Sequence, residues 1–178
     1  MVGRWLFTNR GWLPVPFVAM ALGVRPSHWA AGLVLMLVGE AIRLWAVGHI
    51  GRISRTRADQ VGRLVDVGPY ARLRNPLYVG NIVIFAGFGV IQWPWVLLLV
   101  PLLAAYYSVI VRWEEETLRG AIGAPYLDYC QRVPRWWPAG AARAGEWSAR
   151  EALRSERGTL LVIVIVLLTL VVRWYLPI

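Results

Sequence analysis

The sequence contains no lysine, one cysteine and two histidines. A single cysteine, Cys130, excludes a disulfide within the chain and gives no support for an oxidising compartment. The scarcity of histidine and cysteine also argues against a metal site, and we expect none. Neither a Walker phosphate loop nor a dinucleotide-binding GxGxxG motif is present. These absences exclude the disulfide-stapled, zinc-binding and common nucleotide-binding classes.

Charged residues are also few, at 16% of the chain, whereas 58% of the residues are hydrophobic and 11 are tryptophan. A soluble domain of 178 residues cannot bury that much apolar surface, so the composition indicates one membrane-embedded unit. The formal net charge of +9 comes entirely from arginines, which cluster beside apolar segments. Membrane topology and anionic lipid headgroups explain such clusters better than nucleic acid, which we do not expect as a partner.

Five apolar segments predict an all-α, polytopic membrane protein, because backbone polar groups in lipid must be satisfied within helices. The second segment is long enough to cross a bilayer at about 1.5 Å per residue. A short turn separates the third segment from the fourth. The five predicted spans are residues 11–24, 29–50, 77–92, 93–111 and 159–176.

The arginines predict the orientation of these spans. The two long connections, residues 51–76 and 113–157, hold most of the arginines, whereas the two short connections hold only Arg25. Cytoplasmic loops carry the excess of positive charge, so both long loops are expected inside, with the N-terminus inside and the C-terminus outside. We therefore expect a multipass protein of a prokaryotic inner membrane whose chemistry lies on the cytoplasmic side.

This pattern divides the chain into three predicted parts. Residues 1–138 form the predicted membrane core. Residues 139–157 are expected to be a linker and an interfacial helix, because Trp147 and alternating charges suit the membrane surface. Residues 158–178 form the predicted C-terminal membrane helix. Glu40 and Arg43 lie three residues apart in the second span and predict a buried ion pair, which is either structural or functional.

The stretch GPYARLRNPLYVG, residues 68–80, places polar and rigid groups at the mouth of the third span. Asn75 is a suitable helix cap, and proline at position 76 is preferred in the first helical position. The exposed amides at that helix start, together with Arg74, favour an anion. Tyr70 and Tyr78 add rings with hydroxyl tips. The alternative is an ordinary membrane-entry cap with interfacial anchors.

A second group of candidate residues follows the fourth span directly. Glu114, Glu115 and Glu116 are consecutive carboxylates at a membrane boundary, where they are costly unless paired or functional. The alternative is a solvated run of charge that ends a helix. Tyr126 and the basic, proline-rich residues 129–138 then form a rigid tail that we expect to fold back onto the core.

In this order and spacing, residues 64–138 resemble the integral-membrane methyltransferases that include isoprenylcysteine carboxyl methyltransferase and phosphatidylethanolamine N-methyltransferase. The resemblance covers somewhat under half of the chain. The matching elements are Leu64-Val65, Gly68-Pro69-Tyr70, Arg74-Asn75-Pro76, Tyr78, Gly80, Glu114-Glu115, Leu118, Gly123, Tyr126, Tyr129, Val133-Pro134-Arg135 and Pro138. The chain departs from the usual family pattern at Asn75, where a histidine is common, and at Gly62, which replaces a second histidine; the phospholipid branch also uses Asn-Pro.

The resemblance implies S-adenosylmethionine as methyl donor, held in a cytoplasmic pocket, and a lipophilic or lipidated acceptor arriving from the membrane lipids. The implied cofactor-binding residues are Leu64, Val65, Tyr70, Arg74, Asn75, Tyr78, Glu114, Glu115 and Tyr126. A carboxylate acceptor needs orientation, for which Arg132 or Arg135 is suited, whereas an amine or thiol acceptor needs a base, for which Glu115 and its acidic neighbours are candidates.

Four functions stay open at this point. The leading activity is carboxyl methylation of an isoprenylcysteine-like substrate, and phospholipid amine N-methylation is second. A membrane reductase that uses a nicotinamide cofactor is the third. A scaffold whose basic loops hold anionic lipid is the alternative that involves no catalysis.

Overall fold

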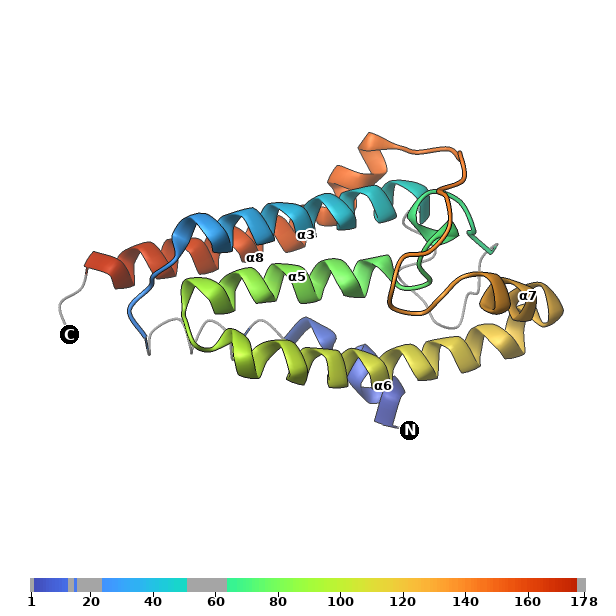
Figure 1. The fold of residues 1–178 in the computed structure, drawn as a ribbon, viewed down its shortest axis with the longest axis horizontal. Coiled ribbons are helices and arrows are strands. Elements are labelled where there is room, and N and C mark those ends of the chain that lie inside the picture. Colours follow the sequence, from blue (N-terminus) through green and yellow to red (C-terminus); the bar gives the residue numbers. More distant parts are fainter. Residues whose placement is uncertain (1, 13–14, 16–23, 51–63, 176–178) are drawn as a thin grey trace.

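The computed structural model describes residues 2–12, 15, 24–50 and 64–175. Within these ranges the chain is all-α, with six α-helices and two short 3-10 helices (Figure 1). The 3-10 helices are η1 (Arg10–Trp12) and η2 (Pro69–Ala71). The α-helices are α1 (Val2–Thr8), α3 (Trp29–Ile50), α5 (Pro76–Ile91), α6 (Val96–Ile122), α7 (Ala124–Arg132) and α8 (Ala149–Tyr175).

Three of these helices, α3, α6 and α8, are long and apolar enough to cross a membrane, and α5 is a shorter apolar helix. The predicted spans 29–50 and 77–92 correspond to α3 and α5. Most of the predicted span 11–24 lies outside the described residues. The predicted span 93–111 is only part of α6, which continues to Ile122 and so carries the three glutamates on a regular helix. Gly123 then ends α6 with a positive φ of 73°, which glycine adopts at no steric cost.

The structure also differs from the sequence prediction at the C-terminal end. The expected interfacial helix and the expected last span form one continuous helix, α8, from Ala149 to Tyr175. Its start is capped by Ser148, whose hydroxyl accepts a hydrogen bond of 3.3 Å from the backbone N–H of Glu151. No proline interrupts residues 149–175, and a single glycine is tolerated inside a helix, so nothing in the local sequence breaks α8 at the predicted boundary.

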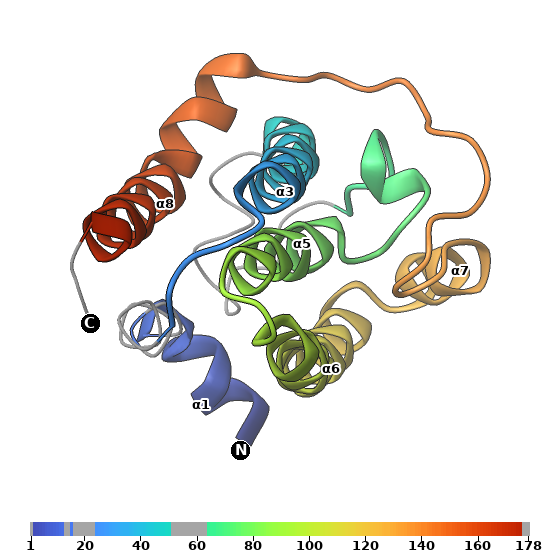
Figure 2. The same ribbon diagram turned by 60° about the vertical axis from the view of Figure 1, so that its left-hand side comes forward.

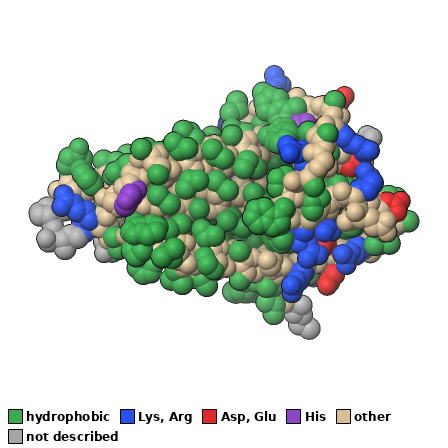
Figure 3. All heavy atoms as spheres, viewed as in Figure 1, with side chains coloured by type: hydrophobic (Ala, Val, Ile, Leu, Met, Phe, Trp, Pro, Cys, Tyr) green, Lys and Arg blue, Asp and Glu red, His purple; other side chains and the backbone are tan. Residues whose placement is uncertain are grey.

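The long helices lie side by side, with α5 between α3 and α6 (Figures 1 and 2). Helix α8 packs against α3, and α1 packs against α6. The buried core joins four helices, with Met36 of α3, Phe88 of α5, Tyr107 of α6 and Leu170 of α8 among its members. The flank of this bundle is hydrophobic, whereas arginines and carboxylates gather at the end that carries α7 and the start of α5 (Figure 3).

Helices α3 and α5 approach each other closely because glycines face one another across their contact. A Cβ atom on Gly39 would lie 2.7 Å from the carbonyl oxygen of Gly80, and one on Gly87 would lie 2.6 Å from that of Gly32. Small residues allow membrane helices to bring their backbones together, where van der Waals packing replaces the missing hydrophobic driving force. This close contact places the polar side chains of α3 within reach of those of α5.

Candidate functional site

The turn before α5, residues 68–75, packs its backbone against the segment that follows α7. Gly68 has a φ of 58°, and a Cβ atom there would lie 2.5 to 2.6 Å from the ring of His49. Its N–H donates a 2.8 Å hydrogen bond to the carbonyl of Arg143. Pro69 and Tyr70 are buried in η2, and Pro76 occupies the first turn of α5 as predicted.

Asn75 does not cap α5 as the sequence predicts. It occupies the capping position but makes no side-chain cap hydrogen bond. Its amide instead donates a 3.2 Å hydrogen bond to the carbonyl of Arg135, while the N–H of Arg74 donates one of 2.9 Å to the carbonyl of Pro134. The prediction is wrong because the capping rule considers only local partners, whereas a carbonyl 60 residues away takes the Asn75 amide.

The tail does fold back onto the core, as predicted. The Tyr129 hydroxyl donates a 2.8 Å hydrogen bond to the carbonyl of Tyr70, and the N–H of Ala139 donates one of 3.0 Å to that of Arg72. Leu64 packs against a small buried cluster formed by Tyr126, Tyr129 and Val133. The segment before α5 and the segment after α6 therefore form one layer at the charged end of the molecule.

Glu115 lies at the centre of this layer and is only 2% exposed. Arg135 holds both carboxylate oxygens, with Nε at 3.0 Å from Oε1 and Nη2 at 2.6 Å from Oε2. Arg74 approaches Oε1 at 3.3 Å, and Arg119 approaches Oε2 at 3.7 Å. Arg74 and Glu115, two of the implied cofactor-binding residues, thus meet, and one buried carboxylate contacts three guanidiniums from three parts of the chain.

The electrostatics of this layer keep its groups in fixed protonation states. The hydrogen bond to Glu115 raises the pKa of Arg135 above its ordinary value, and burial opposes this rise only in part. Burial raises the pKa of Tyr126 and that of Tyr129 above the ordinary phenol value. Near neutral pH the layer therefore presents a charged Arg135 and two protonated phenols.

Tyr78 lies further along α5, beneath this layer. Its ring stacks on that of Tyr107, with centroids 4.8 Å apart and planes tilted by 34°, and its hydroxyl lies close to the carboxylate of Glu114. Adjacent glutamates of α6 point in different directions, since residues next to each other on a helix do not share a face. Glu115 faces the arginines, and Glu114 faces the tyrosines.

Glu115 with Arg74, Arg119 and Arg135 forms what we call the Glu115 cluster. The predicted site residues Arg132 and Val65 are not part of it. Arg132 has a side chain that is 51% exposed and pairs with Asp66 at 3.9 Å. Asp66 also accepts a 2.9 Å hydrogen bond from Arg143. Val65 is half-buried beside Leu64, and no side-chain contact assigns it a role.

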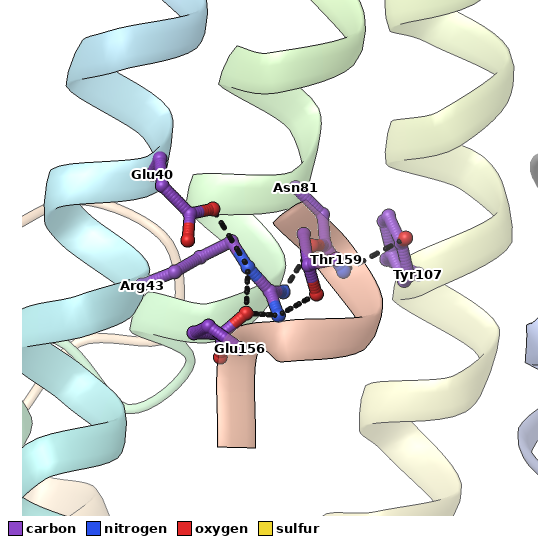
Figure 4. A network of polar contacts seen from close by, with 6 residues as sticks. All are labelled: Glu40, Arg43, Asn81, Tyr107, Glu156 and Thr159. Carbon is purple, nitrogen blue, oxygen red and sulfur yellow. Dashed lines mark hydrogen bonds and ion pairs between the residues drawn. The ribbon is translucent and has the colours of Figure 1, made fainter. Parts of the chain in front are cut away.

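A second polar network crosses the bundle between α3, α5, α6 and α8 (Figure 4). The predicted ion pair of Glu40 and Arg43 is confirmed, with Nε 3.7 Å from a carboxylate oxygen. Arg43 also binds Glu156, through Nε at 3.1 Å and Nη2 at 2.5 Å, and it donates to the side-chain oxygen of Asn81. The Asn81 amide in turn donates a 3.0 Å hydrogen bond to the hydroxyl of Tyr107.

The sequence analysis did not identify two residues: Arg119, which pairs with Glu115, and Glu156, which binds Arg43. Arg119 stands four residues after Glu115, a spacing that predicts a helix pair and was available in the sequence. Glu156 is 113 residues from Arg43, and no local pattern connects the two. Among the described residues, no group of three or more His, Cys, Asp or Glu side chains is arranged to hold a metal ion.

The side chains present fit the chemistry of S-adenosylmethionine, the donor that the resemblance implies. Within the described part of the chain, the Nε atoms of Arg72 and Arg74 are buried and have no hydrogen-bond partner, so two donors are available for a carboxylate. Glu114 and Glu115 offer carboxylates to an ammonium group or to ribose hydroxyls. Both kinds of group lie where the two predicted segments meet.

Comparison with known proteins also indicates a methyltransferase family. Residues 27–123 match the phospholipid methyltransferase family. The chain is 28% identical over 130 residues to protein-S-isoprenylcysteine O-methyltransferase B of Arabidopsis thaliana, covering 65% of this chain and 63% of the relative. It is 31% identical over 121 residues to protein-S-isoprenylcysteine O-methyltransferase of Rattus norvegicus, covering 61% of this chain and 40% of the relative.

A third relative carries a different description. The nickel-cobalt-cadmium resistance protein NccN of Alcaligenes xylosoxydans xylosoxydans is 31% identical over 136 residues, covering 70% of this chain and 61% of the relative. The chain thus spans less than two thirds of the length of each of these three relatives. No solved structure matches the chain.

Proposed function

This chain belongs to the phospholipid methyltransferase family, and we propose that it is a membrane methyltransferase that uses S-adenosylmethionine to methylate a lipophilic acceptor. The observation that carries the proposal is the Glu115 cluster, in which Arg74 before α5 and Arg135 after α6 bind one buried carboxylate. Arg74 lies 41 positions before Glu115 and 61 before Arg135, so distant parts of the chain converge there, beside the start of α5.

When bound, S-adenosylmethionine supplies a methyl group on a sulfonium, which transfers by in-line displacement without a covalent enzyme intermediate. The chain's own residues would bind and align the reactants, which can account for much of the acceleration. Arg74 suits the donor's carboxylate, and Glu114 and Glu115 suit its ammonium or ribose hydroxyls. Leu64-Val65 matches the segment that the resemblance implies to lie near the adenine, and Leu64 packs against the cluster of Tyr126, Tyr129 and Val133.

The acceptor we propose first is a carboxylate of the isoprenylcysteine kind. Arg135 supports this choice, because its part-exposed guanidinium is positively charged near neutral pH and lies beside the buried layer. Arg132 adds a half-exposed guanidinium at the same end of the molecule. A carboxylate oxygen attacks as it stands, whereas an amine must release a proton. Phospholipid amine methylation is the second candidate, since the matched family carries that description.

The site lies on the arginine-rich side of the bundle, which positive-inside counting assigns to the cytoplasm. Figure 3 shows the larger gathering of arginines and carboxylates at this end, with a mostly hydrophobic flank between it and the opposite end. A lipophilic acceptor would therefore reach the site from the inner leaflet, while the water-soluble donor would arrive from the cytoplasm.

Incubation of the full-length protein in liposomes with methyl-labelled donor should label an S-prenylated N-acetylcysteine, and base should release that label as methanol, as expected of a methyl ester. Arg135→Ala should reduce the labelling at least about 100-fold, because it removes the charge that orients the carboxylate and frees Glu115. Arg150→Ala, at the exposed start of α8, is the matched control and should leave labelling unchanged. Base-stable label in phospholipid would select the amine activity instead. Binding of NADPH without binding of S-adenosylhomocysteine would contradict the methyltransferase and favour the reductase.

The dependence of the initial rate on pH separates the two acceptor chemistries. We expect a nearly flat profile between about pH 6.5 and 8.5, because a carboxylate is ionised throughout and the raised pKa of Arg135 keeps that group charged. An amine acceptor would instead lose about tenfold in rate for each pH unit below its own pKa. Initial rates at saturating donor measure this directly, and a slope of that size would contradict carboxyl methylation.

A further inference from the structure

Helix α8 carries a fully buried carboxylate that faces the core of the bundle. Glu156 has no exposed surface, and one of its oxygens accepts two hydrogen bonds from Arg43 (Figure 4). Arg43 also donates a 2.9 Å hydrogen bond to the hydroxyl of Thr159, one turn further along α8. Glu156 and Thr159 lie outside the family match at residues 27–123, so the match gives α8 no role.

Arg43 also links α8 to α5, and its hydrogen bond fixes the orientation of the Asn81 amide. A guanidinium only donates hydrogen bonds, so its contact with Asn81 requires the amide oxygen to face Arg43. The amide nitrogen then points the other way, toward Tyr107, and donates to its hydroxyl at 3.0 Å. The orientation of Asn81 is thereby set from α8, and the Tyr107 hydroxyl is held as an acceptor.

The chain of contacts ends at the candidate site. The ring of Tyr107 stacks on that of Tyr78, and the Tyr78 hydroxyl lies close to the carboxylate of Glu114. Both Tyr78 and Glu114 are among the residues we expect to bind the methyl donor. Polar and stacking contacts therefore run without interruption from the last helix, through α3, α5 and α6, to two donor-binding side chains.

We propose that Glu156 is a positioning residue for methyl transfer, acting through Arg43, Asn81 and Tyr107 to fix Tyr78 and Glu114. This inference rests on the proposed function. A purely structural contact gives less reason for such a network, because replacing a buried ion pair by apolar side chains is often neutral or stabilising. What the polar groups add is a unique orientation for Asn81 and Tyr107. Helix α8 is then part of the site's support and not only a membrane anchor.

The test compares Glu156→Gln with wild type in the full-length protein, using titration with S-adenosylhomocysteine and the kinetics of methyl transfer. We expect donor affinity to fall about tenfold and the donor KM to rise in step, while the acceptor KM stays within about twofold. Glu151→Gln, on the first turn of the same helix, is the matched control and should bind the donor as wild type does. Glu156→Asp keeps the charge and should recover part of the affinity. Unchanged donor affinity in Glu156→Gln would overturn the proposal.

A double-mutant cycle shows whether Glu156 acts through Tyr78. If it does, Glu156→Gln should weaken donor binding much less in a Tyr78→Phe background than in wild type, whereas additive losses would contradict the relay. Should Glu156→Gln fail to fold, Asn81→Leu interrupts the same relay with a side chain of similar volume; it should show the same loss of donor affinity, and wild-type affinity would overturn the proposal. Wild-type protein that does not bind S-adenosylhomocysteine would instead refute the proposed function itself.

Discussion

Glu115→Gln should abolish measurable binding of S-adenosylhomocysteine and reduce methyl transfer at least about 100-fold. The carboxylate is 2% exposed and pairs with Arg74, Arg119 and Arg135, so removing its charge leaves three neighbouring positive groups without their shared counter-charge in a partly buried layer. Breaking a buried ion pair by removing one partner costs about 3–5 kcal/mol, and the lower end applies because two of the guanidiniums are partly exposed. Calorimetric titration measures the affinity, and thermal unfolding measures the stability.

The matched control for this variant is Glu116→Gln, the next residue on α6. It makes the same change of charge and shape, but Glu116 is exposed. Its donor affinity and its unfolding temperature should stay at the wild-type values. Equal losses in the two variants would mean that only the total charge of this helix matters, which would contradict a site built around Glu115.

Gly39→Ala should destabilise the protein strongly although it adds only one methyl group. That methyl group would lie 2.7 Å from the carbonyl oxygen of Gly80 and 2.8 Å from the backbone nitrogen of Ile84. Both neighbours are backbone atoms, so α3 and α5 must move apart, at a cost of about 1–3 kcal/mol or more. Separation also lengthens the contact between Arg43 and Asn81, so we expect activity to fall together with the unfolding temperature.

Gly120→Ala is the matched control, because it makes the same substitution in a helix, and among the described residues no atom beyond the local helix backbone lies within 4 Å of the added methyl group. Alanine is favoured over glycine within helices by about 1 kcal/mol, so this variant should be neutral or slightly stabilising. The two alanine variants should therefore shift the unfolding temperature in opposite directions. Similar shifts would show that the contact between α3 and α5 does not depend on its glycines.

The sequence alone predicted the parts of this protein that depend on local pattern. Long apolar runs predicted α3 and α5 with nearly the observed bounds, because a helix in lipid satisfies its own backbone groups whatever surrounds it. The i, i+3 spacing predicted the pairing of Glu40 with Arg43. The resemblance in residues 64–138 predicted that the tail would bring its residues back to the start of α5.

Only the tertiary structure decided which partner each polar group takes. Asn75 is a good local cap by composition, yet a carbonyl 60 residues away binds its amide. Glu156 reads as one charge in an alternating run, and it is fully buried because Arg43 on another helix meets it. Buried charges must be paired, but sequence spacing identifies a partner only within a turn or two of the same helix. Partners on different helices depend on how the helices pack, and here that packing depends on the facing glycines of α3 and α5.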